Sequence, residues 1–215
     1  SALAGPAYAS AQLLVQQTAY QVSDKIWSIS PETFDLDSAV QEWAKAGEKN
    51  AQGKPTPIVP LQTRAGAGTL ALGYIFSKDF DLSKRHVPQT LLAPSLSLRH
   101  LRGALDQLSL LYRLSSPFVA HVAAADYAGS DGLIADYEPA LQLAEELGLG
   151  LIASTSAHDA QHTALLATLL AQLLPTLHVY DGVRAARESL KVLDVLPAAG
   201  IADLHARLAR AASTL

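Results

Sequence analysis

Three glycines after a short apolar run form the first group of residues whose spacing suggests chemistry. Gly66-Ala67-Gly68, with Gly73 further on, follows a predicted strand and opens a predicted helix. Backbone N–H groups at the start of a helix can hold an anion such as phosphate. The spacing Gly-x-Gly-x-x-x-x-Gly differs from the dinucleotide-binding fingerprint, and no acidic residue stands at a strand end about 20 residues on. Close packing of a helix on a sheet is the favoured interpretation, and phosphate binding is the alternative.

Histidine and serine positions suggest two further kinds of chemistry. His158 and His162 are four residues apart on one predicted helix, so they share a face and have the spacing of zinc ligands. Position 159 is Asp rather than the Glu of a metalloprotease motif, and no third ligand is evident, so a surface pair is favoured. Ser30, Asp181 and a histidine are the parts of a nucleophilic triad. The chain has no Gly-x-Ser-x-Gly nucleophile elbow, so we reject the triad.

The composition limits the class of protein. The chain has 215 residues, a formal charge of −4, 49% hydrophobic residues and 17% charged residues. It has no cysteine and no methionine, which excludes disulfides and cysteine-bound zinc or iron–sulfur centres. The mildly acidic balance argues against a nucleic-acid partner, because nucleic-acid binders carry a basic surface. Since the chain begins with Ser and contains no Met, we interpret it as a segment of a longer protein.

The stretch 160–180 has no charged residue and the length of a membrane span. Pro175 interrupts it, and four polar side chains lie within it: Gln161, His162, Gln172 and His178. A buried helix followed by a buried strand explains the stretch better. We therefore expect no membrane partner.

Short apolar runs and longer helical patterns alternate along the chain. Strands are predicted at 26–29, 58–61, 91–93, 118–123, 150–153 and 177–180. Helices are predicted at 35–46, 65–74, 96–112, 136–147, 157–174, 183–193 and 201–212. Alternation of this kind is typical of right-handed βαβ units. The sequence therefore predicts a three-layer α/β fold, with a doubly wound parallel sheet and helices on both faces.

Parallel sheets of this kind bind ligands at the carboxyl ends of their strands. The loops that follow the predicted strands are therefore the candidate site. They lie at Ser30, Gln62–Ala67, Ser95, Ala124–Gly129, Ser154 and Asp181–Gly182.

Four segments of the chain resemble motifs of the pyruvate:ferredoxin oxidoreductases. Ile29-Ser30-Pro31 resembles their Ile-Thr-Pro turn, and Gln62–Ala67 resembles their Gln-Ser-Glu-Ala-Gly-Ala. His121–Ala125 resembles their His-Val-Ala-Ala-Arg, and Asp181–Arg184 with Glu188 resembles their Asp-Gly-Phe-Arg-Thr-Ser-His-Glu. Order and spacing match over residues 20–195. The resemblance implies the pyrimidine-binding domain of that family, a thiamine-fold α/β domain.

A closer resemblance is to the amino-terminal region of the flavoprotein subunit of fungal assimilatory sulfite reductases. The matching segments are Gly53-Lys54-Pro55, Arg64–Gly68, Leu72-Gly73-Tyr74 and Tyr180-Asp181-Gly182. This resemblance implies a cytoplasmic parent protein that carries NADPH electrons through FAD and FMN to a sirohaem partner subunit, which reduces sulfite to sulfide. It places the flavin domains beyond residue 215. The predicted division is an N-terminal extension (1–20), the thiamine-fold domain (21–196) and a C-terminal helix (197–215).

The departures from the thiamine family concern its chemistry. The family's glutamate, which hydrogen-bonds the aminopyrimidine ring, falls at Arg64, and a guanidinium has no acceptor. The substrate-binding arginine of the family falls at Ala125. The one asparagine of the chain is Asn50, so the Gly-Asp-Gly…Asn set that holds magnesium and diphosphate is missing.

We therefore expect a vestigial cleft with no catalytic residue, cofactor or metal, formed by Ser30, Gln62, Arg64, Gly66, Ala125 and Asp181. The segment is expected to be a structural or assembly module, with a second copy of the chain as a further candidate partner. The alternative is a thiamine-diphosphate-dependent 2-oxo acid oxidoreductase domain in which Arg64 binds phosphate or carboxylate. A small-molecule sensor is a third class.

Overall fold

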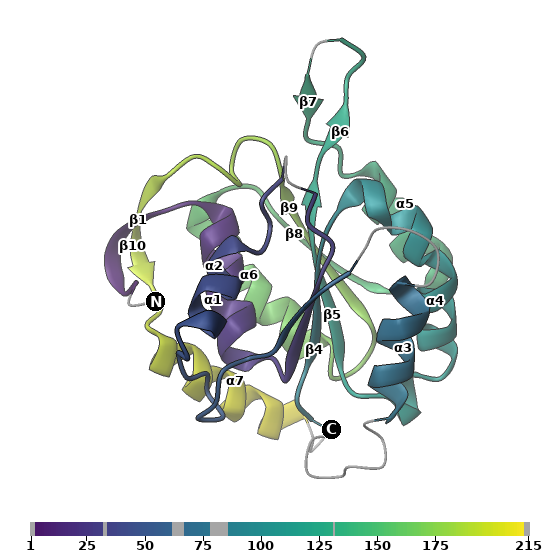
Figure 1. Cartoon of the computed structure of the whole chain (residues 1–215), viewed down its shortest axis with the longest axis horizontal. Helices are drawn as coiled ribbons and strands as arrows, with labels where there is room; N and C mark the ends of the chain where they lie inside the picture. Colours follow the sequence, from purple (N-terminus) through teal and green to yellow (C-terminus); the bar gives the residue numbers. More distant parts are fainter. Residues whose placement is uncertain (1–2, 32–33, 62–66, 78–85, 131, 213–215) are drawn as a thin grey trace.

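The computed structural model describes residues 3–31, 34–61, 67–77, 86–130 and 132–212 (Figure 1). Its strands are β1 (Gly5–Ala9), β2 (Lys25–Ser28), β3 (Ile58–Pro60), β4 (Gln89–Pro94), β5 (Phe118–Ala124), β6 (Asp126–Tyr127), β7 (Leu133–Ile134), β8 (Gly150–Ser154), β9 (Thr176–Asp181) and β10 (Leu190–Val195). Its α-helices are α1 (Ala11–Val22), α2 (Ser38–Lys45), α3 (Ala67–Ser77), α4 (Leu98–Leu110), α5 (Glu138–Leu147), α6 (Ala157–Leu170) and α7 (Ala198–Ala212).

A six-stranded sheet forms the centre of the molecule, in the order β3-β2-β4-β5-β9-β8. Every neighbouring pair in this sheet is parallel. Helices α1, α2 and α6 cover one face, and α3, α4 and α5 cover the other (Figure 1). The predicted fold class, a doubly wound parallel sheet between two layers of helices, is confirmed.

Residue alternation along the central strands assigns each side chain to one face of the sheet. In β5, Ala123 packs with residues of α1 and α6, whereas its neighbour Val122 packs with residues of α4 and α5. Both are fully buried. Strands buried on both faces read as continuous apolar runs, and this is why the sequence located them well.

Residues 5–20, which lie within the expected N-terminal extension, form β1 and most of α1. Helix α1 packs on α6 and α7, and the side chains of Gln12, Gln16 and Gln17 are buried and make hydrogen bonds. The Gln16 carboxamide oxygen accepts the backbone N–H groups of Ala39 (3.0 Å) and Val40 (3.2 Å) at the start of α2. Gln17 donates to the carbonyl oxygens of Leu3 (3.1 Å) and Leu196 (3.3 Å). Gln16 therefore joins α1 to α2, and Gln17 joins α1 to the segments at Leu3 and Leu196.

The predicted helix at 183–193 is wrong. Residues 182–187 form turns, and Leu190–Val195 is β10, which pairs antiparallel with β1. Leu190 and Val192 stand opposite Ala9 and Ala7, and the buried positions of β10 face α6. The helical spacing of 183–193 is overridden by pairing with a strand that the sequence did not reveal.

The stretch 160–180 is the end of α6 followed by β9, as the sequence indicated. Within the described ranges, no helix is long and apolar enough to cross a membrane. Ser156 caps α6, with its hydroxyl oxygen accepting the His158 N–H, and Asp159 completes the capping box.

Candidate functional site

Strands β2 and β4 are neighbours, yet the helices that follow them lie on opposite faces of the sheet. Val40 of α2 packs against the α1 side, and Leu101 of α4 packs against the other side. Ligands of open parallel sheets bind outside the carboxyl ends of the strands at such a switch point. Ser30 and Ser95 follow these two strands, so the structure places both at the expected crevice.

The Ser30 hydroxyl is used to close its own loop. Its oxygen accepts the backbone N–H of Leu36 (2.8 Å). At the base of the same loop, Ser28 donates to Asp37, which also accepts from the Gln41 side chain (2.7 Å). The hydroxyl that resembles the family's threonine therefore holds the β2–α2 connection.

Ala125 and Ser95 form a second closed arrangement at this edge. Ser95 Oγ donates to the Ala125 carbonyl oxygen (2.9 Å) and accepts the Ala125 N–H (3.0 Å). Ala125 is fully buried and packs in the core cluster of α1 and α6. A methyl group therefore lies inside the core at the position where the resemblance expects a substrate-binding arginine. The loop at Ser95 was predicted, but the bond to Ala125 carries no sequence signal.

Asp181 and Gly182 shape the turn after β9. Asp181 Oδ1 accepts the N–H groups of Val183 and Arg184, each at 2.8 Å, and Gly182 donates to the Ala124 carbonyl oxygen at 2.9 Å. A Cβ atom on Gly182 would lie 2.9 Å from the carbonyl carbon of Ala123. The Asp-Gly pair is thus required for the turn to pack against β5.

A tyrosine bonds the end of β8 at the same edge. Tyr137 donates to the Ser154 carbonyl oxygen at 2.9 Å. Burial, followed by the negative charges of Asp181 and Asp159, raises the pKa of Tyr137 to about 12. The phenol therefore remains a neutral hydrogen-bond donor.

Three residues of the predicted cleft, Gln62, Arg64 and Gly66, lie outside the described residues. Helix α3 begins at Ala67 and contains the predicted Gly68 and Gly73, so this segment is a helix as the sequence predicted.

A buried histidine pair lies beneath α6, and the sequence analysis did not predict it. His121 Nδ1 and His178 Nδ1 are 2.9 Å apart, and both side chains are almost inaccessible to solvent. His178 Nε2 bonds the Ser154 hydroxyl, which also bonds Thr163. Within the described structure, His121 Nε2 has no hydrogen-bond partner. In a consistent assignment, His121 Nε2 is unprotonated. His121 Nδ1–H then donates to His178 Nδ1, His178 Nε2–H donates to the Ser154 hydroxyl, and Ser154 donates to Thr163.

Both histidines are held neutral. Burial lowers the pKa of His178 from 6.5 to about 3. Burial, with a smaller contribution from His178, lowers the pKa of His121 well below 6.5. The only sequence signal was two histidines inside otherwise apolar strands.

His158 and His162 are exposed on α6, as the surface interpretation expected. His162 Nε2 is 3.8 Å from Asp194 Oδ2. Among the described residues, no group of three or more His, Asp or Glu side chains has the arrangement of a metal site.

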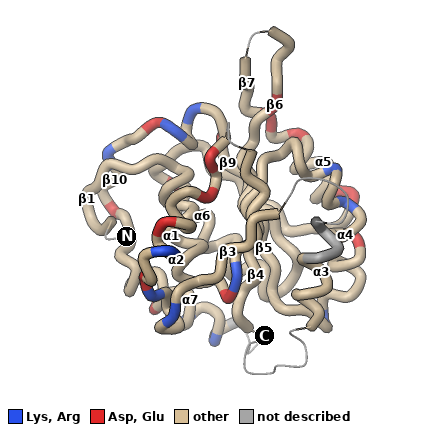
Figure 2. Tube along the Cα trace, in the orientation of Figure 1, with Lys and Arg blue, Asp and Glu red and all other residues tan. Residues whose placement is uncertain are grey.

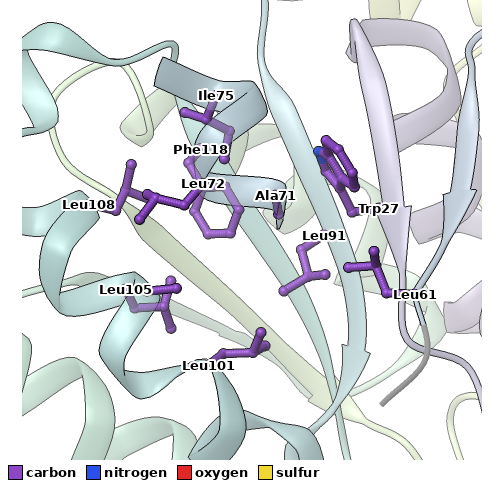
Figure 3. Close-up of a pocket in the computed structure, with 11 residues that line it drawn as sticks. Trp27, Leu61, Ala71, Leu72, Ile75, Leu91, Leu101, Leu105, Leu108 and Phe118 are labelled. Atoms are coloured by element: carbon purple, nitrogen blue, oxygen red, sulfur yellow. The ribbon is translucent and has the colours of Figure 1, made fainter. Parts of the chain in front are cut away.

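An apolar cavity of about 30 Å³ lies between the sheet and helices α3 and α4 (Figure 3). Trp27, Leu91, Leu105 and Phe118 are among the side chains that surround it (Figure 3). Its volume corresponds to about one or two water molecules. This cavity is a packing void away from the carboxyl edge rather than a substrate site.

A larger surface hollow, of about 480 Å³, lies between the starts of α1 and α2. Its lining includes Ser10, Gln16, Ser38 and Arg187. Ser10 Oγ accepts the Leu13 N–H (3.2 Å), and Gln16 accepts two N–H groups of α2. Side chains of the chain itself thus occupy three of the helix-start N–H groups that an anion would use, those of Leu13, Ala39 and Val40.

The strand order and the carboxyl-edge loops define an α/β domain of thiamine-fold-like type. No protein-family model matches the chain. Over 184 residues, or 84% of its length, it is 29% identical to the probable sulfite reductase (NADPH) flavoprotein component of Schizosaccharomyces pombe. It is also 28% identical over 199 residues, or 86% of its length, to the pyruvate:ferredoxin oxidoreductase of Moorella thermoacetica. The chain spans 18% and 15% of these two proteins, respectively.

A solved structure of the 2-oxoglutarate:ferredoxin oxidoreductase of Magnetococcus marinus has a similar fold. The TM-score is 0.61 at 13% sequence identity, over 91% of this chain and 32% of the other. The sequence relatives and this structure confirm both resemblances that the motifs indicated.

Proposed function

We propose that this chain is a non-catalytic structural or assembly domain of the flavoprotein subunit of an NADPH-dependent sulfite reductase. Similarity over most of the chain to a sulfite reductase flavoprotein component supports this assignment. The parent protein would use NADPH, FAD and FMN in its other domains, and would deliver electrons to a sirohaem subunit that reduces sulfite to sulfide. We place the thiamine-fold unit at residues 21–196, which contain the whole six-stranded sheet.

The observation that carries the non-catalytic assignment is the environment of Ala125. The related oxidoreductases act on 2-oxo acids, as the names of pyruvate:ferredoxin and 2-oxoglutarate:ferredoxin oxidoreductase state. A 2-oxo acid carboxylate requires a cationic or strongly donating partner. Ala125 is buried in the core with both its backbone groups bonded to Ser95. An arginine side chain there would have to displace core residues or bury its charge unpaired.

The donor set of the described residues also disagrees with thiamine diphosphate and its magnesium ion. Asn50, the one asparagine, lies in the α2–β3 connection, at the opposite edge of the sheet from Ser30 and Asp181. Its carboxamide donates to Thr56 (2.7 Å) and accepts the Gln52 N–H (2.9 Å). Asp181 is engaged in its own turn. These side chains do not form the oxygen cluster that magnesium and diphosphate need.

A titration separates this proposal from the thiamine-dependent alternative. We expect no heat of binding when thiamine diphosphate and Mg²⁺ are added to the chain up to millimolar concentration. Micromolar binding would overturn the non-catalytic assignment. An Arg64→Glu variant would then be assayed for ferredoxin reduction with 2-oxo acids.

The assembly role is tested in the full-length flavoprotein with residues 1–215 deleted. The deletion is expected to leave NADPH-driven reduction of an artificial one-electron acceptor unchanged, because the flavin domains are intact. It is expected to weaken association with the sirohaem subunit and therefore to lower sulfite reduction. Full sulfite reduction by the deleted protein would contradict the proposal.

A further inference from the structure

Four leucine side chains are exposed together at the amino ends of the central strands, at the edge of the sheet away from the β6–β7 hairpin (Figure 1). Each is between 44% and 72% exposed, and they are Leu110, Leu111, Leu114 and Leu173. The first three lie at the end of α4 and in the turn before β5, and Leu173 lies in the turn before β9. All four line one surface hollow of about 390 Å³. Apolar side chains that gather on one exposed surface, rather than standing singly, are typical of an interaction site.

A second hollow, of about 240 Å³, adjoins the first. Tyr112, Arg113 and Leu173 line both hollows and therefore form the ridge between them. The Tyr112 hydroxyl accepts the Phe118 N–H (2.8 Å) and donates to the Ala171 carbonyl oxygen, so it ties the ridge to the chain on both sides. The ridge is thus fixed in place before any partner binds. We call the residues that line the two hollows the leucine surface.

The polar groups of the leucine surface are bonded within the chain. Ser109 Oγ donates to the Leu147 carbonyl oxygen, and Ser115 Oγ donates to the Tyr112 carbonyl oxygen, each at 3.0 Å. A small polar ligand would have to compete with these bonds. The contact that this surface favours is therefore an apolar one with another protein surface.

The leucine surface carries little charge. Its described residues include Arg113 but no Asp or Glu, and Arg113 already has an interaction within the chain. Charged positions lie instead along helices such as α2 and α5 (Figure 2). A strongly charged partner finds little complementary charge here, whereas a second copy of the same surface meets little like-charge repulsion.

The end of α4 is also complementary to itself. Asp106 is exposed one turn before Leu110, on the same face of the helix, and Arg113 follows Leu110. In a contact with two-fold symmetry, residue i of one copy meets residue j of the other, and j meets i. A two-fold axis near Leu110 therefore brings Asp106 of each copy toward Arg113 of the other. A ridge between two hollows likewise fits an identical surface, because each ridge can enter a hollow of the other copy.

We propose that the leucine surface is the contact between two copies of this chain, related by a two-fold axis near Leu110. The two hollows are lined by ten and eight described residues, three of them shared, which gives fifteen on each copy. A standard interface has about 20–30 residues a side, so the dimer should be reversible, with a dissociation constant of about 1–100 μM. This inference goes beyond the proposed function and does not depend on it, since the contact involves neither the sirohaem subunit nor the flavin domains.

Sedimentation velocity of the 215-residue chain at a series of concentrations tests the proposal. A monomer–dimer equilibrium is expected. Leu110→Ser and Leu173→Ser should each raise the dissociation constant about tenfold or more, because they remove apolar side chains from the centre of the contact. Raising the salt concentration from about 0.05 to about 0.5 M should change it less than about threefold, because salt screens charges and the contact is mainly apolar.

Matched serine variants elsewhere on the surface serve as controls. Leu193 of β10 is 66% exposed and Ile134 of β7 is 49% exposed. Leu193→Ser and Ile134→Ser should change the dissociation constant less than about twofold. All four substituted side chains are exposed, so near-ultraviolet circular dichroism should be the same for every variant.

Cross-linking tests the two-fold axis. Because the chain has no cysteine, a single introduced thiol reports on one position. Leu110→Cys should be cross-linked to its own copy by a short bismaleimide, whereas Tyr8→Cys, at a side chain that is 71% exposed on β1, should not.

Three results would overturn the proposal. The first is a chain that stays monomeric at every concentration. The second is a dimer that the control variants weaken as much as the leucine variants do. The third is a dimer in which Leu110→Cys is cross-linked no more than Tyr8→Cys. The titration with thiamine diphosphate and the deletion of residues 1–215 test the proposed function separately, so the two can fail independently.

Discussion

The two faces of the central sheet are held by different kinds of interaction. Beneath α1, α2 and α6, buried histidine, serine and glutamine side chains form several separate sets of hydrogen bonds. Beneath α3, α4 and α5, the contacts are between leucine and aromatic side chains, and they leave a small apolar cavity (Figure 3). On the polar face, hydrogen bonds position one chain segment against another. On the apolar face, stability comes from buried apolar surface, and the packing is less complete.

Polar side chains of the same kind also hold the shape of the carboxyl edge. Gln16 holds the start of α2, and Gln161 both donates to Leu196 O (3.4 Å) and accepts Leu196 N–H (2.7 Å). Ser30, Ser95 and Asp181 then close the loops at the ends of the strands. Residue types that elsewhere bind substrates are here bonded to the chain itself.

Lowering the pH should destabilise the polar face first, and the resulting loss of unfolding free energy is the largest effect expected. A histidine with a folded pKa below its unfolded value of 6.5 stabilises the fold fully above pH 6.5. That contribution is lost as pH falls toward the folded pKa. For His178, with a folded pKa of about 3, the loss between pH 7 and pH 4.5 is about 3 kcal/mol, and His121 adds to it. Urea unfolding at a series of pH values measures the loss.

A variant shows which histidine is responsible. His121→Leu removes the imidazole whose Nε2 has no partner among the described residues. The number of protons taken up on unfolding near pH 5 should fall by about one. An unchanged pH dependence would show that the exposed carboxylates, rather than the buried pair, govern acid unfolding.

On the apolar face, Leu105→Ala should cost about 3 kcal/mol of unfolding free energy, because it enlarges an existing cavity. Leu105 is buried and lines that cavity. Leu110→Ala, on the same helix at a position 72% exposed, is the control and should change stability by less than about 0.5 kcal/mol. Similar losses for the two variants would mean that α4 does not pack as described.

The sequence predicted the fold well where a strand or helix is defined by its own residues. The six strands of the main sheet are short apolar runs, of which β4 and β5 are buried throughout, and each was located within a few residues. Elements that depend on a distant partner were not predicted. β10 had helical spacing and forms a strand through pairing with β1, and β6 and β7 are two-residue strands with no periodicity.

The candidate site was predicted in position but not in bonding. The rule for parallel sheets placed Ser30, Ser95 and Asp181 at one edge, and all three lie there. Their partners are backbone N–H and C=O groups, which have no residue-type signature. The His121–His178 pair was missed for the same reason, since its strands read as apolar and only tertiary pairing brings β5 beside β9.

Gln16→Ala tests whether one polar side chain positions α2. The variant leaves the N–H groups of Ala39 and Val40 without their acceptor. The expected cost is about 1–2 kcal/mol, similar to removal of a helix cap. Gln107→Ala, at an exposed position of α4, is the control and should be neutral. Hydrogen exchange should localise the Gln16 effect to the first turn of α2, and uniform exchange changes would contradict a positioning role.

The smallest effect is expected from filling the apolar cavity. Ala71 lines it, and Ala71→Val adds two methyl-sized groups that the space accepts, so stability should change by less than about 1 kcal/mol and toward stabilisation. The same substitution at Ala160, which is fully buried on α6 in the other face, should cost about 1–3 kcal/mol through overpacking. Both alanines lie in helices, so the loss of helix propensity cancels in the comparison. Thermal unfolding of the two variants therefore measures the difference in packing between the two faces directly, and equal changes would show that the faces are packed alike.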